Sequence, residues 1–225
     1  MITPRDLAGM IDHTLLRPSA TGEDVQKLCS EADACGFRTV CVNPVLVADA
    51  VRLLRGTSVG VCSVVGFPFG THLVITKAHE AREAVKGGAT ELDMVIRIGA
   101  LREGDDQAVL DDIRAVVEAA DGRPVKVILE TCYLTEEEKV RACIVAVEGR
   151  ASFVKTSTGY GSAGATVKDV TLMRRTVGET FGVKAAGGIR TLADALRMIR
   201  AGANRLGTTG SVAIIKELEG EGQRG

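Results

Sequence analysis

Short apolar segments alternate with amphipathic helical patterns along nearly the whole chain of 225 residues, and this alternation constrains its fold more than any other feature. The predicted strands are rich in Val, Ile, Leu and Cys, and they cover residues 11–15, 38–42, 59–65, 91–96, 125–130, 153–157, 183–186 and 205–206. The predicted helices cover residues 21–34, 45–54, 71–86, 105–120, 135–147, 166–177, 191–201 and 212–218. Each predicted strand is therefore followed by a predicted helix.

Strands with continuous apolar character are typical of a parallel sheet that helices cover on both faces. Eight strand–helix repeats, with no linker or composition break, predict an α/β chain whose residues 1–225 form a single (β/α)8 TIM barrel domain. A doubly wound open sheet is the alternative. Local signals support the helix ends: Thr21 is a predicted N-cap, Gly36 a predicted stop, and Thr135 and Glu138 a predicted capping box.

Composition excludes several classes of function. The formal net charge is -1 and aromatic residues make up 3% of the chain, which argues against a nucleic-acid partner. No apolar run is long enough to span a membrane, and the start of the chain lacks the pattern of a signal peptide. The six cysteines include no Cys-x-x-Cys pair, and the three histidines show no metal-ligand spacing. We therefore expect no metal site and a reduced, cytoplasmic setting.

Polar residues inside the apolar strands are the candidates for chemistry, because catalytic residues of such barrels come from strand ends and the loops that follow. These residues are Asp12, Asp93, Lys126, Lys155 and Lys184. Since side chains alternate between the faces of a strand, Glu91 shares the face of Asp93, and Glu130 can share the inward face of Lys126. We expect the barrel interior to hold at least three lysines and two or three carboxylates. A buried ion-pair network that fixes register is one interpretation, and amine chemistry is the other.

Two of these lysines lie on consecutive predicted strands, and each strand leads into a small-residue loop. Lys155 lies in Phe153-Val154-Lys155-Thr156-Ser157-Thr158-Gly159, and Lys184 precedes Gly187-Gly188. A lysine attacks a carbonyl carbon only as the neutral amine, and a neighbouring cation favours that form. Because neighbouring strands lie about 4.8 Å apart, we expect the charge of Lys184 to keep Lys155 neutral near pH 7. Asp93 could move protons or hold one lysine charged, so the pattern predicts Schiff-base catalysis.

Two glycine loops precede the last two predicted helices. Gly187-Gly188 comes before a helix start at Thr191, and Gly207-Thr208-Thr209-Gly210-Ser211 comes before the final helix. Backbone N–H groups at helix starts bind anions, and barrels often hold phosphate at the loops after strands 7 and 8. The pair of loops predicts a phosphate site, although either loop could be only a tight turn.

Seven segments carry a resemblance to a known family. They are Ile11-Asp12-His13-Thr14-Leu15-Leu16, Val40-Cys41-Val42-Asn43-Pro44, Gly66-Phe67-Pro68-Phe69-Gly70, Glu91-Leu92-Asp93-Met94-Val95, Lys126-Val127-Ile128-Leu129-Glu130-Thr131, the Lys155 segment given above, and Lys184-Ala185-Ala186-Gly187-Gly188-Ile189-Arg190. Together they resemble the deoxyribose-phosphate aldolases along essentially the whole chain. The resemblance implies a class I aldolase on a (β/α)8 barrel, without a metal or organic cofactor. Its reaction would split 2-deoxy-D-ribose 5-phosphate reversibly into D-glyceraldehyde 3-phosphate and acetaldehyde.

The resemblance also implies roles for single residues. Lys155 looks like the Schiff-base lysine, and Lys184 and Asp93 look like the proton-transfer pair. The implied phosphate ligands are Gly187, Gly188, Gly207 and Thr208, and the further substrate contacts are Asp12, Thr14, Cys41, Lys126, Thr158 and Gly159. Such enzymes are homodimers or homotetramers, so we expect one of these assemblies.

One departure from the family pattern lies at the end of the chain. Some members carry a tyrosine in a mobile tail, but here the last tyrosine is Tyr160 and the tail, residues 219–225, has none. We therefore expect no contribution of a tail tyrosine to catalysis. Two other functions stay open from the residues alone: a Schiff-base aldolase or transaldolase for another sugar phosphate, and a barrel that binds a phosphorylated ligand or flavin without catalysis.

Overall fold

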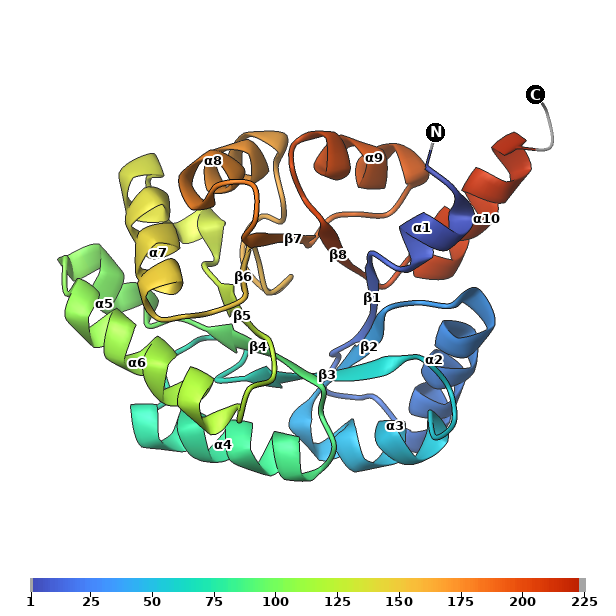
Figure 1. The fold of residues 1–225 in the computed structure, drawn as a ribbon, viewed down its shortest axis with the longest axis horizontal. Coiled ribbons are helices and arrows are strands. Elements are labelled where there is room, and N and C mark those ends of the chain that lie inside the picture. Colours follow the sequence, from blue (N-terminus) through green and yellow to red (C-terminus); the bar gives the residue numbers. More distant parts are fainter. Residues whose placement is uncertain (1, 223–225) are drawn as a thin grey trace.

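A computed structural model of the protein describes residues 2–222, which form a closed barrel of parallel strands in the order β1 to β8 (Figure 1). Because β1 pairs with β8 as well as with β2, the barrel prediction is confirmed and the open sheet is excluded. The strands are β1 (Ile11–Leu15), β2 (Thr39–Val42), β3 (Gly60–Val65), β4 (Glu91–Val95), β5 (Val125–Ile128), β6 (Phe153–Lys155), β7 (Gly182–Ala186) and β8 (Arg205–Thr208).

Helices surround the barrel and connect its strands (Figure 1). They are α1 (Pro4–Ala8), α2 (Gly22–Cys35), α3 (Val47–Leu53), α4 (Val74–Lys86), α5 (Ile98–Glu103), α6 (Asp106–Ala119), α7 (Glu136–Glu148), α8 (Val167–Val177), α9 (Leu192–Arg200) and α10 (Ser211–Gly222), with short 3-10 turns η1 (Pro44–Leu46) and η2 (Thr131–Tyr133). The sequence patterns missed α1 and α5, which are short. In Figure 1, α1 lies against α10, so the first and last helices of the described chain pack together.

The local signals at the helix ends are confirmed. The Thr21 side chain accepts a hydrogen bond from Asp24 N at the start of α2, and Gly36 ends that helix with a φ of 68°. Gly36 suits this left-handed position because it has no Cβ. Thr135 and Glu138 cap the start of α7 reciprocally.

Several predicted boundaries were wrong by two or more residues. The helix predicted over 71–86 begins at Val74, and the strand predicted over 153–157 ends at Lys155. The strand predicted over 125–130 ends at Ile128, because the chain turns through a left-handed conformation at Glu130, where φ is 54°. The last strand, predicted over 205–206, extends from Arg205 to Thr208.

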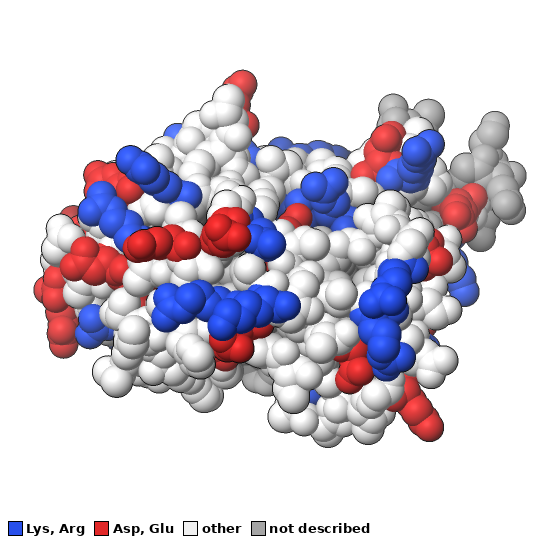
Figure 2. All heavy atoms as spheres, turned by 60° about the horizontal axis from the view of Figure 1, so that its bottom comes forward, with Lys and Arg blue, Asp and Glu red and all other residues white. Residues whose placement is uncertain are grey.

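The apolar core lies between the strands and the helices. Val40, Leu92, Met94 and Val127 come from strand positions that face outward, and each is fully buried. On the face shown in Figure 2, Lys and Arg side chains lie beside Asp and Glu side chains. Among the described residues, no helix is long and apolar enough to cross a membrane.

Candidate active site

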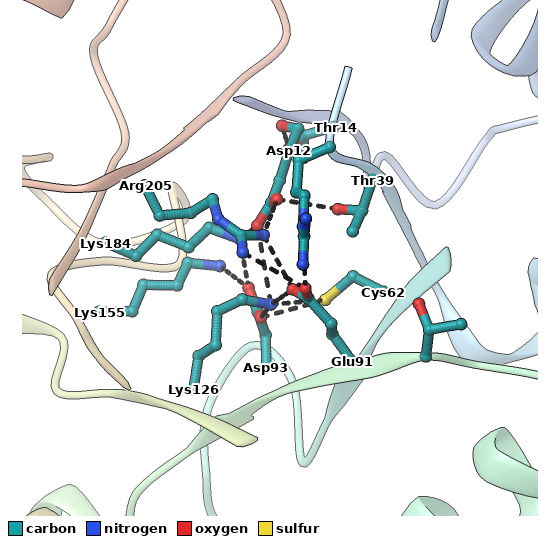
Figure 3. A network of polar contacts seen from close by, with 12 residues as sticks. Asp12, Thr14, Thr39, Cys62, Glu91, Asp93, Lys126, Lys155, Lys184 and Arg205 are labelled. Atoms are coloured by element: carbon teal, nitrogen blue, oxygen red, sulfur yellow. Dashed lines mark hydrogen bonds and ion pairs between the residues drawn. The ribbon is translucent and has the colours of Figure 1, made fainter. Parts of the chain in front are cut away.

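Charged side chains from six strands point toward one another in the barrel interior (Figure 3). The carboxylates are Asp12 of β1 and Glu91 and Asp93 of β4, and the cations are Lys126 of β5, Lys155 of β6, Lys184 of β7 and Arg205 of β8. The register explains the cluster, because paired residues of neighbouring parallel strands share a face: Asp93 pairs with Lys126, and Lys155 pairs with Lys184. All carboxylates therefore come from the first four strands, and all cations from the last four.

The Asp93 carboxylate is the centre of this charged network. Its Oδ2 accepts hydrogen bonds from Lys155 Nζ and Lys184 Nζ, each at 2.7 Å. Its Oδ1 accepts one from Lys126 Nζ at 2.7 Å and one from the Cys62 thiol at 3.1 Å. Burial alone would raise the pKa of Asp93, but attraction by the three ammonium groups outweighs burial and holds this pKa well below its usual value.

Lys184 lies between two carboxylates. Its ammonium donates to Asp12 Oδ2 and to Asp93 Oδ2. Burial disfavours the charged amine, but these two carboxylates outweigh burial and raise the pKa of Lys184 above its usual value. The sequence-based argument considered only the repulsion between Lys184 and Lys155. In the structure Asp93 bridges both ammonium groups, so attraction opposes that repulsion.

Arg205, Lys126, Asp12 and Glu91 form the part of the network farther from the carboxyl ends of the strands. Arg205 donates to Asp12 Oδ1 at 2.7 Å and to Glu91 Oε2 at 2.9 Å. Lys126 Nζ lies 2.7 Å from Glu91 Oε2, and Thr39 donates to Asp12 Oδ1 at 2.9 Å. The inward positions expected for Glu91 and Lys126 are thus observed. The sequence analysis did not predict Arg205 as a member of the network. The strand predicted there had only two residues, so the direction of their side chains was not assigned.

A cavity of about 200 Å³ opens above the network, at the carboxyl ends of the strands. It is lined by Thr14, Leu16, Lys155, Thr158, Gly159, Ala186, Gly187, Gly188, Ile189, Arg190, Gly207, Thr208 and Thr209. Of the seven charged side chains of the network, all within the described part of the chain, only Lys155 lines this cavity. Lys155 therefore joins the buried charges below to the open space above.

The structure separates the residues that the sequence grouped as substrate contacts. Thr14, Thr158 and Gly159 line the cavity, and so do the residues expected to bind phosphate. The cavity lining does not include Asp12, Cys41 and Lys126, which are fully buried. Five further lining residues were not predicted as contacts, although all of them lie in segments quoted above: Leu16, Ala186, Ile189, Arg190 and Thr209.

The two glycine loops depend on their glycines for different reasons. Gly187 has a φ of 86°, and a Cβ there would lie 2.9 Å from Gly164 Cα. A Cβ on Gly207 would lie 3.0 Å from Lys184 Cε, so this glycine leaves room for the lysine below. The Thr208 hydroxyl donates to Ile189 O at 2.6 Å and accepts from Gly210 N at 2.9 Å. This hydroxyl connects the two loops, so its own proton is engaged within the protein.

Glu130 does not lie inside the barrel as expected. It follows the end of β5 in a left-handed conformation, and its carboxylate accepts hydrogen bonds from the N–H and the hydroxyl of Thr158. Burial raises the pKa of Glu130, and the bonds from Thr158 oppose this rise. Glu130 therefore fixes the loop after β6, which carries two of the cavity-lining residues.

Cys41 and Cys62 pair across β2 and β3 and face inward beside Asp93, so that the potential ligand atoms of all three lie within 4.8 Å of one another. The Lys126 ammonium lies 3.3 Å from Cys62 Sγ and 2.7 Å from Asp93 Oδ1. The Lys126 ammonium is thus already bound to two of these three potential ligands.

Tyr160, the last tyrosine of the chain, lies at the rim of the barrel. Its hydroxyl donates to Leu16 O at 2.8 Å, and its ring packs edge-on against Phe67 at 5.5 Å. The expectation about a tail concerned residues 219–225, of which 219–222 belong to α10 and 223–225 lie outside the described residues.

A barrel that places one lysine between a buried charge network and a cavity with glycine loops is typical of enzymes that use an amine on a small substrate. Residues 7–216 match the model of the DeoC/LacD family aldolases. A curated protein from Carboxydothermus hydrogenoformans named deoxyribose-phosphate aldolase is 55% identical over 222 residues, which is 97% of either chain. One of the same name from a Geobacillus species is 55% identical over 212 residues, covering 94% of this chain and 95% of the relative.

Solved structures agree with these sequence matches. A structure described as a tetrameric deoxyribose phosphate aldolase from Aeropyrum pernix superposes with a TM-score of 0.91 and 35% identity. The superposition covers 96% of this chain and 92% of the Aeropyrum pernix chain. The chain belongs to the DeoC/LacD family of aldolases, which makes it a lyase.

Proposed function

We propose that the protein is a class I aldolase that cleaves 2-deoxy-D-ribose 5-phosphate reversibly to D-glyceraldehyde 3-phosphate and acetaldehyde, through a Schiff base on Lys155. The observation that carries this proposal is the position of Lys155, the only charged member of the described network that lines the cavity. Family membership and the names of the relatives support the reaction and the substrate.

The proposed reaction begins when neutral Lys155 attacks the C1 aldehyde of the open-chain sugar. Loss of water gives an iminium, which accepts the electron pair when the C3 hydroxyl is deprotonated and the C3–C4 bond breaks. The resulting enamine is protonated and hydrolysed, which releases acetaldehyde and restores the amine. The cation on the iminium nitrogen is stabilised by Asp93, whose carboxylate already lies 2.7 Å from Lys155 Nζ.

Lys184 and Asp93 form the proposed proton-transfer pair. The network favours a protonated Lys184 and an ionised Asp93. These are the protonation states of an acid and a base, but the raised pKa of Lys184 weakens it as an acid and the lowered pKa of Asp93 weakens it as a base. Both are buried and neither lines the cavity, so the proposed relay runs through Lys155 or a water molecule.

The phosphate is proposed to bind at the loops after β7 and β8. Gly187, Gly188, Gly207 and Thr208 line the cavity there, and the Thr208 hydroxyl holds the loops together. A comparison of kcat/KM for 2-deoxyribose and its 5-phosphate tests this site. A much higher value for the phosphate ester is expected, because remote binding groups can lower the barrier. Equal values would remove these four residues as phosphate ligands.

Borohydride trapping tests the central claim about Lys155. Reduction in the presence of substrate should leave an adduct on Lys155 whose mass matches the sugar phosphate or the acetaldehyde fragment. A Lys155→Met variant treated in parallel should give none. An adduct of another mass would favour an aldolase or transaldolase for a different sugar, and no adduct would favour a barrel that only binds its ligand.

We further propose that the protein is a cytoplasmic homodimer or homotetramer that serves deoxyribose phosphate catabolism, a branch of carbohydrate degradation. The tetrameric relative supports an assembly, and six free cysteines are typical of a reducing compartment. Sedimentation of the purified protein at micromolar concentration tests the assembly, and a mass equal to one chain would contradict it.

A further inference from the structure

His13 lies on β1 between two inward-facing residues, but its own ring faces outward toward α2 and α10. The side chain is buried, and its ring packs against Phe37 with 5.1 Å between ring centroids. His13 Nε2 lies 3.0 Å from Glu31 Oε2 of α2, and Nδ1 lies 3.0 Å from Ser211 Oγ, at the first residue of α10. His13, Glu31 and Ser211 have no part in the reaction described above.

The partners of the ring define its tautomer. An ionised carboxylate only accepts hydrogen bonds, so we assign the N–H of the neutral ring to Nε2, which donates to Glu31. Nδ1 is then an acceptor, and the one proton of the Ser211 hydroxyl is shared between Nδ1 and Thr208 O. Burial lowers the pKa of His13 below its usual value although Glu31 opposes this shift, and a lowered pKa is consistent with a neutral ring.

Ser211 connects the histidine to the loop that follows β8. Its Oγ also lies 3.1 Å from Thr208 O, so the one hydroxyl contacts His13 and the loop backbone. The Thr208 hydroxyl in turn donates to Ile189 O in the loop after β7. With the Ser211 proton shared between His13 and Thr208 O, a series of polar contacts runs from α2 through His13 to both glycine loops of the cavity.

Hollows lie beside the exposed part of this loop, at Thr209. Thr209 borders the active-site cavity and also two further hollows of about 290 and 390 Å³, and His13 borders both of these hollows. Gly210 contributes no side chain to the interior. Hydrogen bonds of Thr208 and Ser211 therefore help to fix the backbone of residues 207–210.

We propose that His13 is a positioning residue for the substrate phosphate, which it controls by holding Ser211 and with it the loop of residues 207–210. This inference rests on the proposed function, since it assumes that the loop binds the phosphate. His13 touches no reacting atom, so its loss should weaken the use of the phosphate group far more than the chemistry at Lys155.

Four substitutions separate the two ends of the ring. In His13→Asn the amide oxygen lies near the position of Nδ1 and can still accept a hydrogen bond from Ser211. In His13→Gln the amide group lies near the position of Nε2, so it keeps the hydrogen bond to Glu31 and loses the one with Ser211. Ser211→Ala removes the other partner of the same bond. His79→Gln, an exposed position on α4, is the control for a histidine change far from the loop.

The measurements are kcat/KM for 2-deoxyribose 5-phosphate and for 2-deoxyribose, and the inhibition constant of inorganic phosphate. We expect His13→Gln and Ser211→Ala each to reduce the ratio of the two kcat/KM values about five- to tenfold, the effect of one hydrogen bond, and to raise the phosphate inhibition constant by a similar factor. His13→Asn should keep the ratio within about twofold of the parent value, and His79→Gln should not change it.

Each outcome decides between the inference and the function beneath it. If the parent enzyme uses both sugars equally, the phosphate site is refuted and the role of His13 falls with it. If the parent strongly prefers the phosphate ester and both His13→Gln and Ser211→Ala keep that preference, the inference alone is wrong. An equal loss on both sugars also refutes it, since a general structural defect would produce that result. Ser211→Ala decides the question if His13→Gln does not fold.

Discussion

Replacing Asp93 with Asn tests the charge balance of the barrel interior. The substitution keeps the size of the side chain and removes the negative charge that Lys126, Lys155 and Lys184 share. The network described above has four cations and three carboxylates, so the variant leaves two carboxylates for the same four cations. We expect a large loss of stability together with a loss of aldolase activity.

The distances give the size of the expected effect. At the observed separations of 2.7 Å and an effective dielectric constant of about 20, each ammonium attracts the carboxylate by roughly 6 kcal/mol before desolvation is counted. Desolvation cancels most of this attraction, and breaking a buried ion pair costs about 3–5 kcal/mol in net terms. Urea unfolding followed by circular dichroism should therefore show the free energy of unfolding of Asp93→Asn lower by about this amount at pH 7.

The difference in the free energy of unfolding between the parent and Asp93→Asn should depend on pH. Asp93 has a lower pKa in the folded protein than its usual value of 3.8, so its charge stabilises the fold fully above that value and less as the pH falls toward the folded pKa. The gap between the parent and Asp93→Asn should thus narrow by about 1 kcal/mol between pH 7 and pH 3.

Two results would refute this reasoning. One is a loss of less than about 1 kcal/mol at pH 7, which would mean that the buried charges do not depend on Asp93. The other is a gap that stays constant down to pH 3. Asp49→Asn is the matched control, because Asp49 pairs with Arg52 at 3.1 Å on an exposed helix surface, where removal of the charge should change stability little.

Three further predictions concern other parts of the barrel. Lys184→Leu should fold but lose activity at pH 7 and regain part of it at higher pH, because removal of this cation favours the charged form of Lys155; a pH–rate profile that stays flat and inactive would instead indicate a direct proton-transfer role. Gly187→Ala should lower the melting temperature by several degrees, since its φ of 86° and the nearby Gly164 backbone leave no room for a Cβ, and an unchanged melting temperature would contradict this. Lys77→Met should cost about 3–5 kcal/mol in urea unfolding because it leaves the buried Asp112 unpaired, whereas adding Asp112→Leu should restore most of the loss; a double variant as unstable as the single one would contradict it.

The sequence predicted the barrel and much of the charged network because both depend on local periodicity. Alternation along each strand is enough to turn Asp93 of β4 and Lys126 of β5 inward. The order of the strands in the chain is enough to bring Lys155 of β6 beside Lys184 of β7. The order of the strands then follows from their order in the chain. Such patterns do not depend on which residues meet from distant segments.

The remainder of the site depends on contacts that no local pattern records. Arg205 lies in a strand whose predicted length was too short to show its facing, and Glu130 leaves the strand because its backbone turns. His13 and Ser211 are separated by 198 positions, so only the closure of β1 against β8 brings them together. The two-lysine argument likewise omitted the carboxylate of Asp93 between the amines.

The distribution of charge between the two halves of the barrel has a consequence for how the chain is made. The ribosome releases β1 to β4 first, and these strands carry all the carboxylates of the network. Their lysine and arginine partners lie on β5 to β8, which are made later. The later half brings only cations to the same space, so neither half can dehydrate its interior face until the other is present. The interior network thus favours joint burial of the two unlike halves of this barrel. Two copies of the same half, in contrast, would repel each other across the shared interior.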